Sequence, residues 1–160
     1  MSIKVGDKIP SVTLMQMTAD GPKPISTDEV FAGKKVVLFA VPGAFTPLCS
    51  GQHLPGYLKL VDQFKAKGVD QIVCVSVNDA FVMGAWAKDQ QVGDKILMLA
   101  DGNGDFTRAM GLELDGTGFG MGKRSQRYAL IAENGIIKHL GVEEGRNFEA
   151  SKAETILALL

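Results

Sequence analysis

The chain of 160 residues has 46% hydrophobic and 22% charged residues, which is the balance of an ordinary globular protein. Its 17 basic and 18 acidic residues are interspersed and give a net charge of −1, so neither nucleic acid nor an anionic membrane is an expected partner. No apolar stretch approaches the ~18 residues of a membrane-spanning helix, and the length predicts a single domain over residues 1–160.

Four short apolar runs predict buried strands, over residues 35–41, 71–77, 96–100 and 128–132. The pair Asn134-Gly135 predicts a hairpin turn, so residues 135–142 should return antiparallel to the strand before it. Between and after the strands lie helical patterns, over residues 54–67, 80–90, 104–110 and 148–160. This alternation predicts an α/β fold with a central mixed sheet and helices on both faces.

One of the two cysteines, Cys49, follows the strand over 35–41 and a turn rich in Pro and Gly. Thr46 stands where a helix N-cap would be and Pro47 at the first helical position, so Cys49 falls in the first turn. The unpaired N–H groups and the positive dipole end there stabilise a thiolate, the reactive form of cysteine. A buried structural cysteine is the alternative, and the strand-turn-helix context favours a functional thiol.

Two details of the same segment refine this hypothesis. Gly51, Pro55 and Gly56 are poor residues for a helix interior, so the first turns should be irregular and easily loosened. A thiol that later meets a bulky reductant benefits from such looseness. Cys49 begins no Cys-x-x-Cys motif, which disfavours a dithiol reductase of the thioredoxin type.

The segment from Pro42 to Tyr57 resembles the active-site segment of type II peroxiredoxins. The family pattern Pro-x-x-x-Thr-x-x-Cys is satisfied by Pro42, Thr46 and Cys49. The resemblance continues in order through residues 78–88, 100–107, 111–115, 124–130 and 138–139. It covers nearly the whole chain and implies a thioredoxin-like fold and an antioxidant, thiol-dependent peroxidase of hydrogen peroxide and organic hydroperoxides.

The resemblance also implies roles for four residues. Cys49 would be the peroxidatic nucleophile, which attacks the peroxide and becomes a sulfenic acid. Thr46 would donate to and accept from the peroxide, and Pro42 would shield the thiolate. Arg127 precedes the strand over 128–132, where the fold could bring it beside Cys49 to favour the thiolate and bind peroxide oxygens.

The roles of His53 and Cys74 are open. His53, four residues after Cys49, could be the general base of a Cys–His pair, but Gly51 and Pro55 favour a supporting imidazole instead. Cys74 could be a resolving cysteine or a buried sheet residue. The second interpretation is preferred, because a central strand is rigid and disulfide geometry is demanding.

Some relatives carry a resolving cysteine late in the chain, whereas residues 140–160 contain none. A one-cysteine cycle is therefore expected, with glutathione and glutaredoxin as the implied reductants and thioredoxin as the alternative. The family also implies a homodimer. The absence of a signal-peptide core in the first residues and of a disulfide framework predicts a cytoplasmic protein.

Two other functions would use the same residues. A non-enzymatic peroxide sensor or interaction module would use the same Cys49, and a Cys–His hydrolase would use Cys49 with His53. Residues 101–105 lack the glycine and glutamate of a calcium loop, and residues 116–123 lack the spacing of a phosphate loop. No metal and no bound cofactor are expected.

Overall fold

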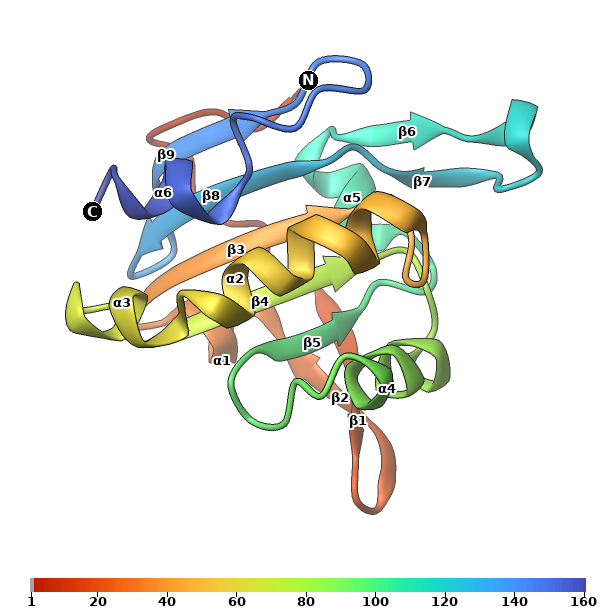
Figure 1. The fold of residues 1–160 in the computed structure, drawn as a ribbon, viewed down its shortest axis with the longest axis horizontal. Helices are drawn as coiled ribbons and strands as arrows, with labels where there is room; N and C mark the ends of the chain where they lie inside the picture. The colour runs from red at the N-terminus through yellow and green to blue at the C-terminus, as the bar shows by residue number, and fades with distance from the viewer. Residues whose placement is uncertain (1) are drawn as a thin grey trace.

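The computed structural model describes residues 2–160 and shows a seven-stranded mixed sheet between two layers of helices (Figure 1). The strands are β1 (Thr13–Thr18), β2 (Gly21–Ser26), β3 (Lys35–Val41), β4 (Gln71–Ser76), β5 (Leu97–Ala100), β6 (Glu113–Asp115), β7 (Lys123–Ser125), β8 (Tyr128–Glu133) and β9 (Ile136–Val142). The helices are α1 (Thr27–Phe31), the π-helix η1 (Cys49–His53), α2 (Leu54–Lys59), α3 (Val61–Ala66), α4 (Ala80–Asp89), α5 (Asp105–Met110), the 3-10 helix η2 (Thr117–Phe119) and α6 (Ala153–Leu157).

The strand order of the large sheet is β2-β1-β5-β4-β3-β8-β9, and β6 pairs with β7 in a separate hairpin. Strands β3, β4 and β5 run parallel, whereas β8 runs antiparallel to β3 and to β9. The Asn134-Gly135 hairpin between β8 and β9 is present as predicted. This topology brings the start of β8 beside the end of β3, because Ala40 pairs with Tyr128.

The alternation of side chains in β3 shows how the core divides into two layers. Val37, Phe39 and Val41 belong to one hydrophobic cluster, and the intervening residues of β3 belong to the other. Helices α2, α3, α4 and α6 cover the first face of the sheet, and α1 and α5 cover the second. The predicted mixed sheet with helices on both faces is confirmed.

The N-terminal strand pair was not predicted. β2 contains Pro22 and Pro24, which disfavour a strand because proline donates no ladder hydrogen bond. The structure places β2 at the edge of the sheet, paired only with β1, where proline is tolerated.

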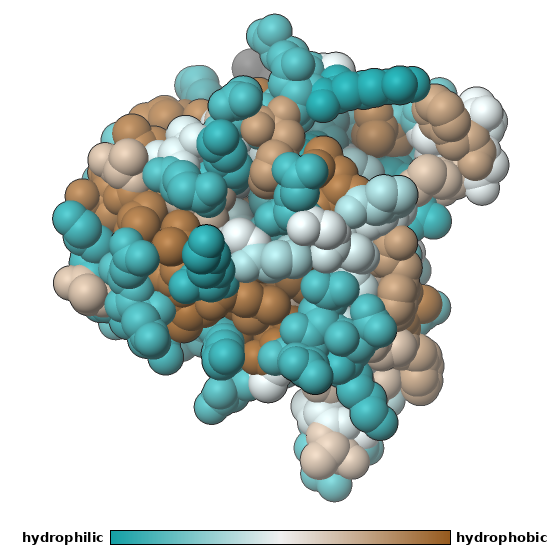
Figure 2. Space-filling model, viewed as in Figure 1, coloured by the Kyte–Doolittle hydropathy of each residue, from teal (hydrophilic) through white to brown (hydrophobic). Residues whose placement is uncertain are grey.

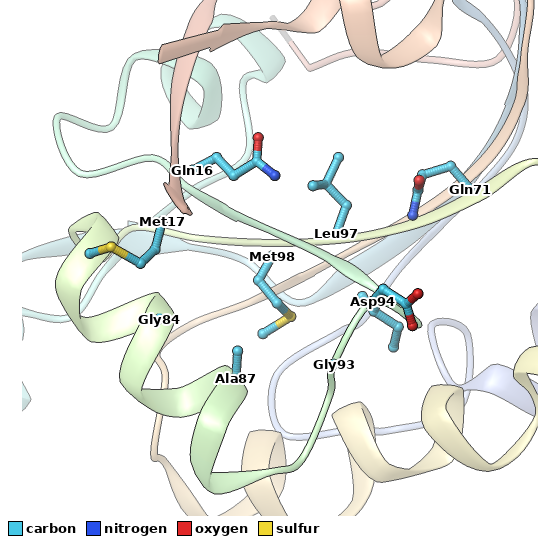
Figure 3. Close-up of a pocket in the computed structure, with 10 residues that line it drawn as sticks. Gln16, Met17, Gln71, Gly84, Ala87, Gly93, Asp94, Leu97 and Met98 are labelled. Atoms are coloured by element: carbon cyan, nitrogen blue, oxygen red, sulfur yellow. The ribbon is translucent and has the colours of Figure 1, made fainter. Parts of the chain in front are cut away.

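Between β1, β5 and α4 lies a surface pocket of about 320 Å³ whose lining includes Met17, Gly84 and Met98 (Figure 3).

Two predicted helices differ from the structure. The helix over 54–67 is divided at Leu60, whose backbone leaves the helical region (φ −104°, ψ 9°). The helix over 148–160 is confined to α6, because the N–H groups of residues 149–151 donate to the Glu143 carboxylate instead of opening a helix. Within residues 2–160, no helix combines the length and the apolar character needed to cross a bilayer.

Candidate functional site

The turn after β3 sets the approach to Cys49. Pro42 is the first residue after β3 and is half-buried. Phe45 has a left-handed backbone (φ 65°), an uncommon conformation for a bulky residue, and its side chain is exposed. The turn is held by side-chain hydrogen bonds: Thr46 Oγ1 donates to the Gly43 carbonyl at 2.7 Å, and Ala44 N–H donates to Asn78 Oδ1 at 3.0 Å.

Cys49 opens the π-helix η1 and is fully buried. Helical backbone begins at residues 47–48, and the Thr46 carbonyl accepts from Ser50 N–H at 2.9 Å, so Thr46 occupies the N-cap position as predicted. The Cys49 carbonyl accepts from Leu54 N–H, five residues on, which is the spacing of a π-helix. The irregular turn expected around Gly51 is therefore present, and π-turns occur often at functional sites.

Arg127 reaches this thiol from the neighbouring strand. It stands immediately before β8, and the pairing of β8 with β3 carries it to the end of the sheet where Cys49 lies. Its Nη2 atom donates to Cys49 Sγ at 3.1 Å. This contact places a positive charge and an N–H donor directly beside the buried sulfur.

The same guanidinium contacts His53. Arg127 Nη1 lies 2.8 Å from His53 Nδ1, and His53 Nε2 lies 3.0 Å from the Ser151 carbonyl oxygen. Burial, and then the charge of Arg127, lower the pKa of His53 to about 3, so the imidazole is neutral at physiological pH. Its Nδ1 lone pair faces the arginine, and the geometry therefore favours the supporting imidazole over the general base.

Cys74 lies in β4, where its register partners are Phe39 of β3 and Met98 of β5. Its side chain is fully buried, and both cysteines are free thiols. Burial, and then the nearby Cys49, raise the pKa of the Cys74 thiol well above its usual range. The surroundings of Cys74 thus maintain the protonated, less nucleophilic form.

Several contacts of the site were not predicted from the sequence. Tyr57 donates its hydroxyl to the Ser151 carbonyl at 2.8 Å, and Trp86 Nε1 of α4 donates to Ser50 Oγ at 2.9 Å. Nothing in the local pattern of residues 143–152 indicates that this segment reaches His53. Only the pairing of β8 with β9 brings it there.

The Asp101 loop has a structural role in helix capping. Its carboxylate accepts from the N–H groups of Phe106 and Thr107 and from the Thr107 hydroxyl, which opens α5. The loop is therefore a turn that leads into a helix. Over residues 2–160, no group of three or more His, Cys, Asp or Glu side chains is arranged to hold a metal ion.

Comparison with known proteins places this arrangement in a family. A family model described as Redoxin matches residues 4–157. Peroxiredoxin-2E, chloroplastic, of Arabidopsis thaliana is 48% identical over 163 residues, which cover 99% of this chain and 70% of the relative. The structure of reduced Prx3 of Vibrio vulnificus in complex with hydrogen peroxide has 59% identity and a TM-score of 0.94, with 98% of each chain covered.

A more distant structure, an antioxidant protein of Plasmodium falciparum described as a 1-Cys peroxiredoxin, has 33% identity and a TM-score of 0.91, with 98% of each chain covered. The fold that these structures share is the thioredoxin-like fold of thiol-based oxidoreductases, which confirms the predicted fold. Within that class, the chain belongs to the redoxin family as a type II peroxiredoxin. It is a thiol peroxidase, with a peroxide as substrate and a reductant as partner.

Proposed function

We propose that Cys49 is the peroxidatic cysteine and that it reduces both hydrogen peroxide and organic hydroperoxides. The observation that carries the proposal is the 3.1 Å contact between Arg127 Nη2 and Cys49 Sγ. It places a cation and an N–H donor beside both the sulfur and the position where the peroxide oxygens arrive.

In the first step, the Cys49 thiolate forms a bond to one peroxide oxygen while the O–O bond breaks. The second oxygen takes the electron pair of that bond and a proton and leaves as water or an alcohol, and the sulfur is oxidised to a sulfenic acid. Negative charge develops on the leaving oxygen. Arg127 and the N–H of Cys49, in the first turn of the helix, are the donors proposed to stabilise it.

Thr46 and Pro42 shape the place where the peroxide would bind. The Thr46 hydroxyl proton is directed to Gly43, which leaves oxygen lone pairs to accept an O–H group of the peroxide. Pro42 has no N–H and is half-buried, so it can close the pocket without a competing donor. We assign both residues to peroxide binding and Cys49 and Arg127 to bond breaking.

The sulfenic acid is proposed to be reduced by an external thiol in a one-cysteine cycle. A first thiol attacks the sulfenic sulfur, forms a mixed disulfide and releases water, and a second thiol attacks that disulfide and restores the Cys49 thiolate. The protonated Cys74 in its central strand supports this cycle, as does the likeness to the 1-Cys peroxiredoxin of Plasmodium falciparum. Glutathione and glutaredoxin are the proposed donors.

A buried Cys49 must become accessible before a bulky donor can reach it. The π-helix η1 contains Gly51, and a Cβ added at that position would meet nothing within 4 Å. Local opening of η1 is therefore the proposed route, because few side-chain contacts hold the turn at Gly51.

A homodimer is proposed on the basis of three exposed phenylalanines. Phe45, Phe81 and Phe119 are 51%, 67% and 78% exposed, and they lie before η1, in α4 and in η2. Apolar side chains also gather along the right-hand edge in Figure 2, where Figure 1 shows α4 and the β6–β7 hairpin. Such a patch is typical of a protein interface.

A cytoplasmic location also stays a proposal, which cell fractionation would test.

Steady-state peroxide consumption tests the proposed function. The purified protein is assayed with glutathione and glutaredoxin, and in parallel with thioredoxin and its reductase. We expect turnover with the first pair that is lost in a Cys49→Ser variant. Oxidation of Cys49 without turnover by either donor would instead support a peroxide sensor, and turnover only with thioredoxin would replace the proposed reductant.

A further inference from the structure

The carboxylate of Glu143 organises the segment that follows β9. Its Oε2 atom accepts from Glu149 N–H at 2.9 Å, from Ser151 N–H at 2.8 Å and from the Ser151 hydroxyl at 2.6 Å. Its Oε1 atom accepts from Ala150 N–H at 3.2 Å. Burial alone would raise the pKa of Glu143, but these hydrogen bonds outweigh it and hold that pKa below its usual range. One ionised side chain thus fixes a turn of three residues.

This turn directs the Ser151 carbonyl into the site. The carbonyl oxygen lies 3.0 Å from His53 Nε2 and accepts from the Tyr57 hydroxyl at 2.8 Å. Ser151 is fully buried, as are His53 and Tyr57. In this buried place, the carbonyl is the partner of two polar atoms, His53 Nε2 and the Tyr57 hydroxyl, that would otherwise be unsatisfied.

The chemistry of that carbonyl fixes the tautomer of His53. A carbonyl oxygen can only accept, so His53 Nε2 carries the hydrogen. The Nδ1 atom of the neutral ring then has a lone pair, which accepts from Arg127 Nη1 at 2.8 Å. With Nη1 engaged in this way, Nη2 is directed at Cys49 Sγ.

The imidazole ring is also held in orientation by its neighbours. Three aromatic rings surround it, those of Phe39, Tyr57 and Phe148, with centroid separations of 4.8, 5.7 and 5.1 Å. A half-turn of the ring about Cβ–Cγ would put C–H groups in the places of Nδ1 and Nε2, so the hydrogen bonds to the guanidinium and to the carbonyl would both be lost. The packing and the hydrogen bonds therefore specify a single arrangement.

A backbone hydrogen bond also links Glu143 directly to Arg127. Glu143 N–H donates to the Arg127 carbonyl at 2.9 Å, so the same residue anchors the main chain of Arg127 and the turn that orients its guanidinium through His53. Gly141 permits this approach, because a Cβ at that position would lie 2.5 Å from the Ala150 carbonyl oxygen. A side chain there would displace the turn.

We propose that Glu143 is a positioning residue for the peroxidatic site: through the Ser151 carbonyl it selects the His53 tautomer that orients Arg127 toward Cys49. This role rests on the proposed function of Cys49. It assigns a catalytic consequence to a carboxylate that touches neither the thiol nor the peroxide. The Glu143 carboxylate also explains why the segment after β9 is a turn rather than the start of a helix, because it accepts from the N–H groups of residues 149–151.

The test uses Glu143→Gln, with Glu144→Gln as the matched control on the neighbouring exposed residue. The glutamine amide in the variant has one acceptor oxygen, so at least one N–H of the turn would face a donor. We expect the second-order rate constant with hydrogen peroxide to fall about tenfold in the Glu143 variant, within the range seen for coupled networks. The control should keep the parent rate.

Two further readouts separate positioning from general destabilisation. The nitrogen NMR shifts of His53 should show a hydrogen on Nε2 alone in the parent and control, and a mixed signature in Glu143→Gln. In a His53→Ala background, Glu143→Gln should cause no further loss of rate, because its effect passes through the missing ring. An unchanged rate, or equal losses with and without His53, would overturn the proposal.

Ser151→Ala is the milder second variant if Glu143→Gln does not fold. It removes only the hydroxyl bond to Glu143 and keeps the carbonyl, so a smaller shift in the same two readouts is expected. The two hypotheses fail in different ways. If the parent protein reduces no peroxide, the proposed function is wrong, whereas a His53 tautomer that ignores both substitutions contradicts the positioning role alone.

Discussion

Cys49 and Cys74 are two thiols of one hydrophobic cluster, and both are fully buried. Cys74 lies in β4, between β3 and β5, where the sheet fixes its backbone on both sides. Cys49 lies in a π-turn beyond the end of β3, in a backbone that contains Gly51. Burial is thus the same for the two residues, and their local structure is not.

The difference shows that burial does not by itself decide the chemistry of a thiol. Around Cys74, burial raises the pKa and favours the neutral form. Within residues 2–160, the structure shows one side-chain hydrogen bond to a cysteine sulfur, from Arg127 to Cys49. A positioned cation and a π-turn distinguish Cys49, the proposed nucleophile, from Cys74.

The largest effect on peroxide turnover should come from substituting each of the two cysteines separately. Cys49→Ser should reduce peroxide consumption to the background rate of the added thiols, because no sulfur nucleophile is left beside Arg127. Cys74→Ala should keep turnover, because the second thiol is assigned no chemical step. Parallel assays with glutathione and glutaredoxin measure both, and a Cys74 variant without turnover would contradict the comparison.

Removal of the cation should have the next largest effect. Arg127→Gln should slow the reaction of Cys49 with peroxide by about 10²-fold, the loss typical of one transition-state donor. Arg127→Lys keeps the charge but not the planar fork that bridges Cys49 Sγ and His53 Nδ1, so an intermediate loss is expected. Stopped-flow kinetics give both rate constants, and a Gln variant as fast as the parent would remove Arg127 from the proposal.

The neutral imidazole beside Arg127 predicts sensitivity to acid. His53 stays neutral down to a pKa of about 3 in the folded protein, whereas the unfolded chain protonates it near 6.5. The unfolded state therefore binds the extra proton between these values, and stability should fall by roughly 1.4 kcal/mol per pH unit across most of that window. The lowered pKa of Glu143 acts in the same direction.

His53→Gln tests this assignment, since glutamine keeps one acceptor and one donor but does not titrate. Its free energy of unfolding should depend less on pH between pH 6.5 and about pH 4 than that of the parent protein. Urea unfolding at several pH values provides the measurement. Equal pH slopes in the two proteins would mean that the buried imidazole does not govern acid sensitivity.

The smallest effect should come from removing the hydrogen bond that Trp86 of α4 donates to Ser50 of η1. Ser50→Ala leaves the buried Trp86 N–H without its partner, which should cost about 1 kcal/mol of stability and loosen the turn that holds Cys49. Alkylation followed by peptide mapping should then label Cys49 faster than in the parent and leave Cys74 unchanged. Equal acceleration at both thiols would indicate general destabilisation instead.

The regular parts of the fold could be predicted because their signals are local. The apolar run over 35–41 matches β3, and Asn134-Gly135 identifies the hairpin of β8 and β9. The edge strand β2 was missed because its prolines contradict strand propensity, which its place in the sheet overrides. That residues 1–160 form one domain stays a prediction, and a single transition in denaturant would support it.

The site could be predicted only where its residues lie close together in the sequence. The N-cap at Thr46 and the irregular turn at Gly51 follow from residues near Cys49 in the sequence. The partner of His53 does not, because Ser151 is 98 positions away and contributes a backbone carbonyl that any residue could supply. The helix expected from residue 148 failed for the same reason, since Glu143 captures its first N–H groups.

Intact mass with peptide mapping, after about one equivalent of hydrogen peroxide and without reductant, tests the central distinction most directly. The account predicts rapid gain of one oxygen on Cys49, while Cys74 remains a free thiol. A disulfide between Cys49 and Cys74 would keep the peroxidase and overturn the structural role of Cys74. A Cys49 that stays unmodified while peroxide persists would contradict the account at its centre.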